Sequence, residues 1–141
     1  MKIRIDFVTN SSSSSFIIAY KELPKIDKET LKKYPFLKGY EKLIEKVLFT
    51  AGNYETTEGI VSKTKEEFIE NFMEEYGWGG DNLEEVLEDE YLKDIYDKSM
   101  EYIEKGYNIL DKRVSYSDSY CSSMIRELAK EDDNFVILED E

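Results

Sequence analysis

Carboxylates are the side chains that this chain carries in quantity for chemistry. It has 32 Asp and Glu residues, one cysteine and no histidine among 141 residues. Without histidine, the Ser-His-Asp and Cys-His modes of nucleophilic catalysis are excluded within the chain, as are His-ligated zinc and iron sites. A general base would have to be a carboxylate, a lysine or a tyrosine with a shifted pKa.

Carboxylates that converge could also bind Mg²⁺ or Ca²⁺ and so build a metal-dependent hydrolase. The chain lacks the ligand spacing of an EF-hand loop. A nuclease-like group is suggested only loosely, by Asp111-Lys112-Arg113 within an expected strand. No residue is therefore assigned as catalytic, cofactor-binding or metal-ligating, we expect no cofactor, and the hydrolase stays open as an alternative.

The acidic residues are concentrated in one segment. Residues 66–104 hold 15 acidic and two basic residues, whereas the rest of the chain holds 17 of each, so the segment carries the entire net charge of −13. Residues 21–46, by contrast, hold eight lysines and five acidic residues. This arrangement has a cost, because like charges four apart on a helix, such as Glu66 and Glu70, destabilise it by about 0.2–0.5 kcal/mol.

Two interpretations of the acidic segment remain open: a docking face for a basic protein surface, and a solvated face that aids solubility. The docking interpretation places its contacts on two expected helices, over residues 64–76 and 82–105. The partner-binding residues would be Glu67, Glu70, Glu74, Glu84, Glu85, Glu88, Asp89 and Asp94. Direct binding of nucleic acid is not expected, because phosphates require a basic footprint.

The single cysteine, Cys121, cannot form an internal disulfide or a Cys-based zinc site, which indicates a reducing compartment. It shares a helical stripe with Met124, Ile125 and Leu128, so we expect it to be buried. The longest apolar run near the N-terminus, residues 16–20, is too short for a signal peptide or a membrane span. We therefore expect a cytoplasmic protein without membrane contact, and no oligomeric state follows from the sequence.

A run of serines, Ser11–Ser15, is expected to form a polar hairpin loop, whose N–H and hydroxyl groups could bind an anion. The segment from Phe7 to Phe16, FVTNSSSSSF, resembles an N-terminal signature of small bacterial and phage proteins. The resemblance implies a phage or mobile-element setting, in which acidic inhibitors of host factors are frequent. It implies no activity, cofactor or catalytic residue.

The hydrophobic pattern predicts a single α+β domain over residues 1–141, with a small mixed sheet of about four strands. The strands are expected at 2–8, 15–21, 107–116 and 134–139. The first two would form an N-terminal hairpin. The last two would form a parallel βαβ unit, with the continuous apolar residues 135–138 interior to the sheet. Residues 59–61 are a further candidate for a short strand.

Helices between residues 27 and 105 are expected to cover one face or one end of the sheet. Thr64 with Glu67, and Asp81 with Glu84, have the spacing of a capping box, and a bend or a break is expected near Asp89. We favour a non-enzymatic acidic interaction protein that occludes a basic, nucleic-acid-binding surface of its partner. The alternatives are the hydrolase and a structural or accessory protein that self-associates through its sheet edge.

Overall fold

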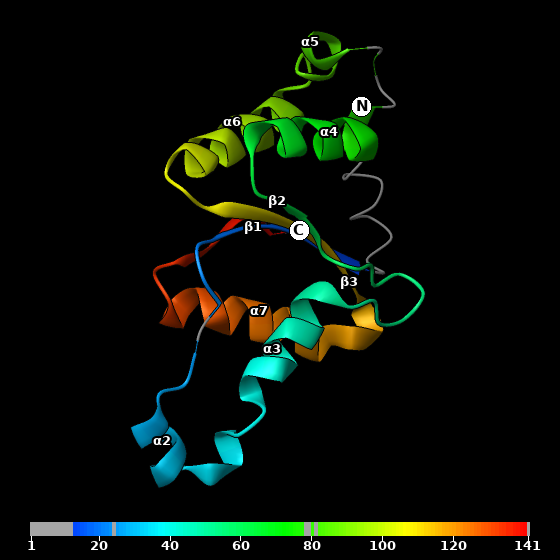
Figure 1. The fold of residues 1–141 in the computed structure, drawn as a ribbon. Coiled ribbons are helices and arrows are strands. Elements are labelled where there is room, and N and C mark those ends of the chain that lie inside the picture. Colours follow the sequence, from blue (N-terminus) through cyan, green and yellow to red (C-terminus); the bar gives the residue numbers. More distant parts are fainter. Residues whose placement is uncertain (1–12, 24, 78–79, 81, 141) are drawn as a thin grey trace.

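A four-stranded antiparallel sheet lies between two layers of helices in the computed structural model, which describes residues 13–23, 25–77, 80 and 82–140 (Figure 1). The strands are β1 (Ser13–Tyr20), β2 (Ile60–Ser62), β3 (Asn108–Ser115) and β4 (Phe135–Asp140). Their order is β2-β3-β1-β4, and each neighbouring pair is antiparallel. The predicted α+β class and the sheet of about four strands are confirmed, whereas the predicted mixed sheet is wrong.

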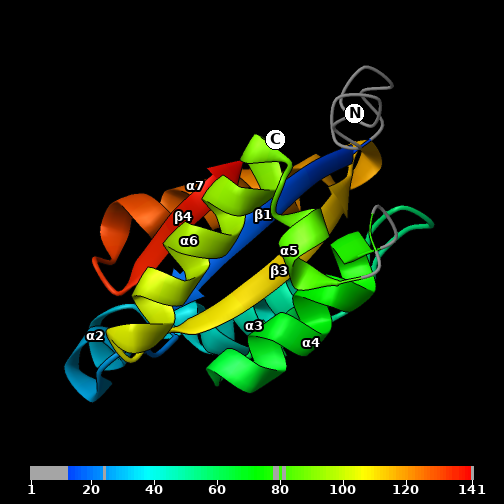
Figure 2. The same ribbon diagram turned by 90° about the horizontal axis from the view of Figure 1, so that it is seen from above.

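Helices cover both faces of the sheet, and not one face as expected. They are α2 (Lys28–Lys33), α3 (Tyr40–Phe49), α4 (Lys65–Tyr76), α5 (Leu83–Val86), α6 (Glu90–Glu104) and α7 (Ser119–Glu131), with 3-10 turns η1 (Pro35–Leu37) and η3 (Tyr116–Asp118). α4 and α6 lie on one face, and α3 and α7 on the other (Figures 1 and 2). α2 and η1 extend beyond the second layer and contain no buried residue.

The central strand β1 explains why two layers are needed. Phe16, Ile18 and Tyr20 pack into the core formed with α3 and α7. Ile17 and Ala19 belong to a second core formed with α4 and α6. A strand buried on both faces is continuously apolar, and residues 16–20 have that composition.

The interior position predicted for residues 135–138 is wrong, because β4 is an edge strand. Helices α6 and α7 contact β4 from opposite faces, and Val136, Ile137 and Leu138 are half-buried between them. The apolar run therefore reflects cover on both faces and not a central place in the sheet.

Two other expectations concern the partners of β1. The strand expected at 2–8 lies outside the described residues, and residues 16–20 already pair with β3 on one side and β4 on the other. β3 and β4 are both antiparallel to β1, so they run in the same direction with β1 between them. β3, α7 and β4 therefore form a parallel βαβ unit, as predicted, although its two strands are not neighbours in the sheet.

Helices α4, α5 and α6 each begin after a residue whose side chain caps the helix N-terminus. The Thr64 hydroxyl accepts a hydrogen bond from the Glu67 N–H at 3.1 Å, as predicted. The cap of α5 is Asn82, whose Oδ1 accepts from the Glu85 N–H at 3.0 Å; Asp81, predicted to pair with Glu84 in a capping box, lies outside the described residues. Asp89 caps α6 by accepting from two backbone N–H groups, and α5 ends at Val86, so the helix expected over 82–105 is broken near Asp89, as predicted.

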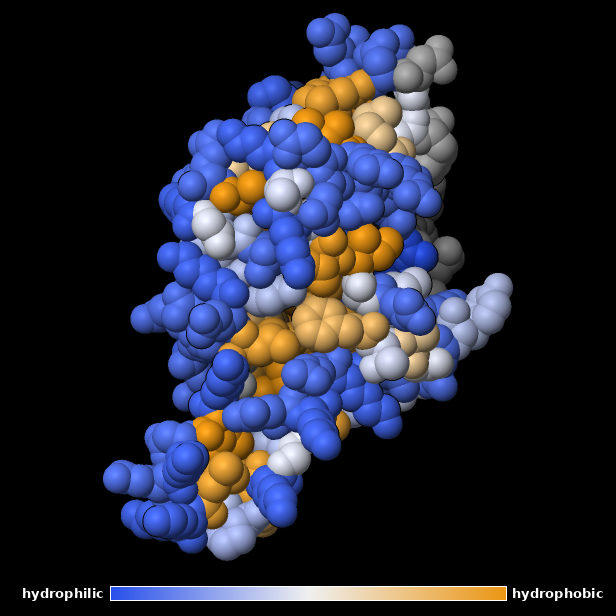
Figure 3. All heavy atoms as spheres, viewed as in Figure 1, coloured by the Kyte–Doolittle hydropathy of each residue, from blue (hydrophilic) through white to orange (hydrophobic). Residues whose placement is uncertain are grey.

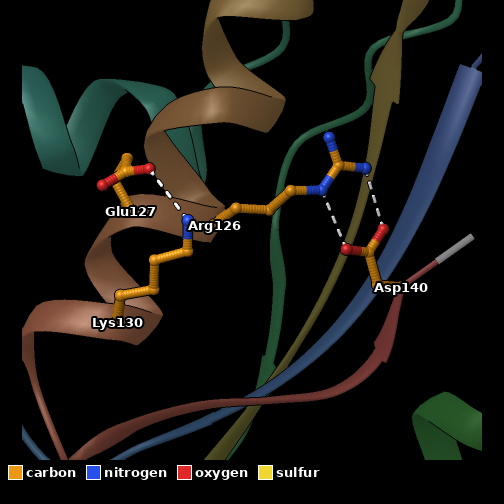
Figure 4. A network of polar contacts seen from close by, with 4 residues as sticks. All are labelled: Arg126, Glu127, Lys130 and Asp140. Carbon is orange, nitrogen blue, oxygen red and sulfur yellow. Dashed lines mark hydrogen bonds and ion pairs between the residues drawn. The ribbon is translucent and has the colours of Figure 1, made fainter.

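The second layer is joined to β4 by a two-pronged ion pair. Arg126 of α7 donates from Nε and Nη2 to the two carboxylate oxygens of Asp140, at 2.8 and 2.9 Å (Figure 4). The Arg126 guanidinium also lies over the Phe16 ring, 5.3 Å from its centroid. This planar, bidentate geometry suits arginine and fixes the last strand against α7.

Candidate acidic docking face

Helices α4, α5 and α6, here called the acidic layer, expose one face to solvent because their opposite face packs on the sheet. The rings of Phe68 and Phe72 of α4 pack at an angle against that of Tyr96 of α6, with centroids 5.8 and 5.5 Å apart. Lys65 and Glu104 join the two helices through an ion pair of 2.7 Å. The apolar stripes set which way each helix is rotated, so the remaining carboxylates point outward.

Four of the eight predicted contact residues take part in local structure. Glu67 accepts from the Lys63 N–H at 3.5 Å, and Glu85 accepts from the Asn82 side chain at 3.4 Å. Asp89 is the half-buried cap of α6. Asp94 pairs with Lys98 at 2.9 Å and, by accepting this hydrogen bond, raises the pKa of Lys98.

The other four predicted residues are exposed and make no ion pair or side-chain hydrogen bond within the described residues. They are Glu70, Glu74, Glu84 and Glu88. Glu66 and Glu90, which the sequence argument did not select, share both properties. The composition of residues 66–104 could have found these two, because it marks every acidic position in the layer.

The structure does not gather the predicted residues into one tight cluster. Glu70 and Glu74 lie on α4, whereas Glu84 belongs to α5, which lies beyond the α4–α6 pair on the side away from the sheet (Figure 1). The geometry is that of a broad charged face, which suits another macromolecule more than a single ion. Figure 3 shows this part of the molecule as predominantly hydrophilic.

The lysine-rich segment lies on the far side of the sheet from the acidic layer (Figure 1). All eight lysines between residues 21 and 46 are exposed, and none forms an ion pair within the part of the chain that the structure describes. The two charged surfaces therefore do not neutralise each other within the molecule. The fold turns a charge asymmetry along the sequence into one between two faces.

The suggested nuclease-like group at the end of β3 does not converge. Asp111 accepts a hydrogen bond from the Tyr76 hydroxyl at 3.1 Å, and Arg113 pairs with Glu75 at 3.6 Å, both on the side of α4. Lys112 points to the opposite face, where its ammonium donates to the carbonyl oxygens of Thr50 and Thr57. Alternation along a strand separates these side chains, and burial lowers the pKa of Lys112.

Sequence reasoning missed a buried polar cluster around Asp118. Its carboxylate accepts from the Thr56 hydroxyl at 2.6 Å and from the Asn53 N–H at 3.1 Å, which lowers its pKa. The Thr56 hydroxyl in turn accepts from the Ser115 N–H at 2.6 Å. These bonds tie the connection between α3 and β2 to the start of α7. No periodic signal marks such a contact between residues about sixty positions apart.

Other predicted features have ordinary structural places. Cys121 is buried beside Ile125 and Leu128, as predicted. Ser13–Ser15 belong to β1 and pair with β3, so the predicted hairpin loop over Ser11–Ser15 is wrong for these three residues. Ser11 and Ser12 lie outside the described residues.

Across the described ranges, no three Asp, Glu or Cys side chains are grouped so that they could hold a metal ion. Within the same ranges, no helix combines the length and the apolar character needed to cross a membrane. No family model, curated protein or solved structure matches the chain.

Proposed function

We propose that this chain is a non-enzymatic interaction protein of the cytoplasm whose acidic layer docks on a basic surface of a partner protein. The observation that carries the proposal is the set of exposed carboxylates on α4, α5 and α6 that form no ion pair within the described residues. Natural helices readily place lysines four residues from glutamates. Here such pairs occur on α6 but are missing around Glu70.

The expected mechanism is occlusion by charge and shape. A surface of one sign accelerates encounter with a surface of the other sign and weakens as salt increases. A basic surface that binds nucleic acid is the most strongly charged partner of this kind, so the acidic layer would compete with phosphates for the same lysines and arginines. A phage or mobile-element origin, implied by the resemblance of Phe7 to Phe16, fits an inhibitor of this type.

The test is affinity capture from a lysate of the native host at low and at high salt. We expect a basic partner that is retained at low salt and released at high salt. The double variant Glu70→Lys with Glu88→Lys should lose it. The matched control, Glu45→Lys with Glu131→Lys, makes the same change in net charge on exposed positions of α3 and α7 and should retain it.

Equal retention of the partner by the two double variants would contradict the proposal, because the carboxylates of the acidic layer would then matter no more for binding than those on α3 and α7. Loss of DNA or RNA binding by the captured partner, measured on addition of the wild-type chain, would establish occlusion. If the chain binds the partner without reducing its binding of DNA or RNA, the docking proposal stands and the proposed inhibition is wrong.

A further inference from the structure

Strand β2 ends the sheet next to the acidic layer. It pairs only with β3, in a register that places Ile60 opposite Asp111 and Ser62 opposite Ile109. Within the described part of the chain, residues 60–62 make no other backbone hydrogen bond. An open strand edge is a template on which an extended segment of another chain can pair.

A small cavity lies beside this edge, between α4 and strands β2 and β3. Its volume is about 20 Å³, and its apolar lining includes Ile60, Phe68, Phe72 and Ile109. A cavity of about this size holds one water-sized group, which is also the size of a methyl group. Ile60 is 43% exposed, and Figure 3 shows a hydrophobic patch at the level of β2, below the hydrophilic surface of α4.

Carboxylates line the side of α4 that faces β2. The Asn71 side chain donates to the Ser62 hydroxyl at 2.9 Å, which identifies that side of the helix. Glu67 and Glu74 are four residues before and three residues after Asn71, so they lie along the same side. Glu75 lines the cavity itself.

We propose that the partner adds an extended basic segment to β2 as a further strand; this rests on the proposed function and names the part of the partner that is bound. A small aliphatic side chain of that segment fills the cavity. Lysine or arginine residues two positions before and after it meet Glu67 and Glu74. The occupant is basic because this edge combines unpaired main-chain groups and an apolar cavity with carboxylates on the helix above.

The spacing of the two elements is compatible with this arrangement. Side chains on one face of a strand recur every ~6.7 Å, so the two basic residues would be ~13 Å apart. Glu67 and Glu74 are separated by ~10.5 Å along the axis of α4, from a rise of ~1.5 Å per residue. Lysine and arginine side chains are long and flexible enough to accommodate this difference.

The probe is a labelled peptide in which lysine, valine and lysine occupy alternate positions among threonines. Its controls are a shuffled peptide of the same composition and two N-methylated versions, each blocking one alternate set of backbone amides. Only one set of amides in an added strand faces β2. We therefore expect one methylated version to lose about tenfold in affinity, the other to bind like the parent, and the shuffled peptide to bind weakly.

Amide NMR shifts of Ile60, Val61 and Ser62 on titration would locate the peptide. Glu74→Lys should weaken binding, whereas Glu45→Lys, an exposed control on α3, should leave it unchanged. Equal affinities for parent, shuffled and both methylated peptides, or no binding of any of them, would overturn the inference. The capture experiment with the double variant Glu70→Lys and Glu88→Lys tests the proposed function independently of this peptide. Loss of the partner by that variant would still support the docking face, whereas unchanged capture would contradict the proposed function.

Discussion

At the scale of single residues, Lys112 is a buried cation that stabilises this fold through hydrogen bonds to the backbone. Its side chain is fully buried, and its ammonium donates to the carbonyl oxygens of Thr50 and Thr57. Burial disfavours the charged form and lowers the pKa, so the two carbonyls must offset that cost. The residue therefore holds the connection between α3 and β2 against the sheet.

Replacing this ammonium tests that role. Lys112→Met keeps most of the side-chain volume but leaves the two carbonyls without their donor, so we expect the free energy of unfolding to fall by about 1–3 kcal/mol. Urea denaturation measures the change. The control Lys130→Met, on the exposed face of α7, should stay within about 0.5 kcal/mol of wild type. A Lys112 variant as stable as that control would show that the carbonyls find water instead.

Asp118 gives a prediction in pH. Hydrogen bonds from Thr56 and Asn53 lower its pKa below the ordinary value of 3.8. A carboxylate of this kind contributes stability that is complete above its unfolded pKa and is lost as pH falls through its folded pKa.

We therefore expect Asp118→Asn to have a lower Tm than wild type at neutral pH, with the difference shrinking as the pH falls below about 3.8. Thermal unfolding at several pH values measures this. Asp133→Asn, at an exposed position of the turn before β4, is the control. A difference that persists unchanged in acid would mean that the Asp118 carboxylate does not hold the loop as an anion.

At the scale of elements, the sequence predicts what is decided locally. The Thr64 cap, and the apolar stripe that buries Cys121, follow from neighbours within four residues. The partners of a strand depend instead on residues far along the chain, so the alternation of residues 2–8 led to a hairpin that β1 cannot make along residues 16–20. The short strand β2 was only a candidate because three residues carry little periodic signal.

The same distinction applies to the candidate site. The acidic layer can be predicted from the sequence because its carboxylates are concentrated in one segment, residues 66–104. A count of charges cannot tell Asp89, which caps α6, from Glu88, which is exposed and has no partner within the described residues, because that difference depends on backbone direction. The cavity beside β2 brings together residues from five elements, and no sequence pattern marks it.

Substitutions of the neighbouring residues Asp89 and Glu88 distinguish a carboxylate that stabilises the fold from one that is available for binding. Asp89→Ala should lower the free energy of unfolding by about 1 kcal/mol, because two N–H groups at the start of α6 lose their acceptor. Glu88→Ala should change stability by less than about 0.5 kcal/mol. Chemical denaturation measures both, and equal stabilities would show that solvent replaces the cap.

At the scale of the whole molecule, the concentration of negative charge on the acidic layer lowers the stability of the fold. Glu66, Glu70 and Glu74 follow at four-residue intervals on α4, all exposed. Glu84 and Glu88 are also four residues apart, but they do not share a helix because α5 ends at Val86. The repulsion is therefore concentrated on α4, with Glu70 between two like charges.

Glu70→Lys should turn two repulsive pairs into two attractive ones and stabilise the protein by about 1 kcal/mol, from ~0.2–0.5 kcal/mol for each pair lost or formed. The stability gain should shrink at high salt, which screens these charges. Urea denaturation at two salt concentrations measures it. Capture of the basic partner by the same variant should weaken, because a surface selected for binding can keep charges that cost stability. A stabilised variant that binds its partner undiminished would favour the solubility interpretation.

The position of β1 bears on how the chain is made by the ribosome. Both neighbours of this strand come from the other end of the sequence: Ile18 pairs with Leu110 and with Ile137. At roughly 5–20 residues per second, translation leaves the apolar residues 16–20 without either neighbour for several seconds. The centre of the sheet is thus made first and completed last, and until then its strand is a substrate for chaperones or for aggregation.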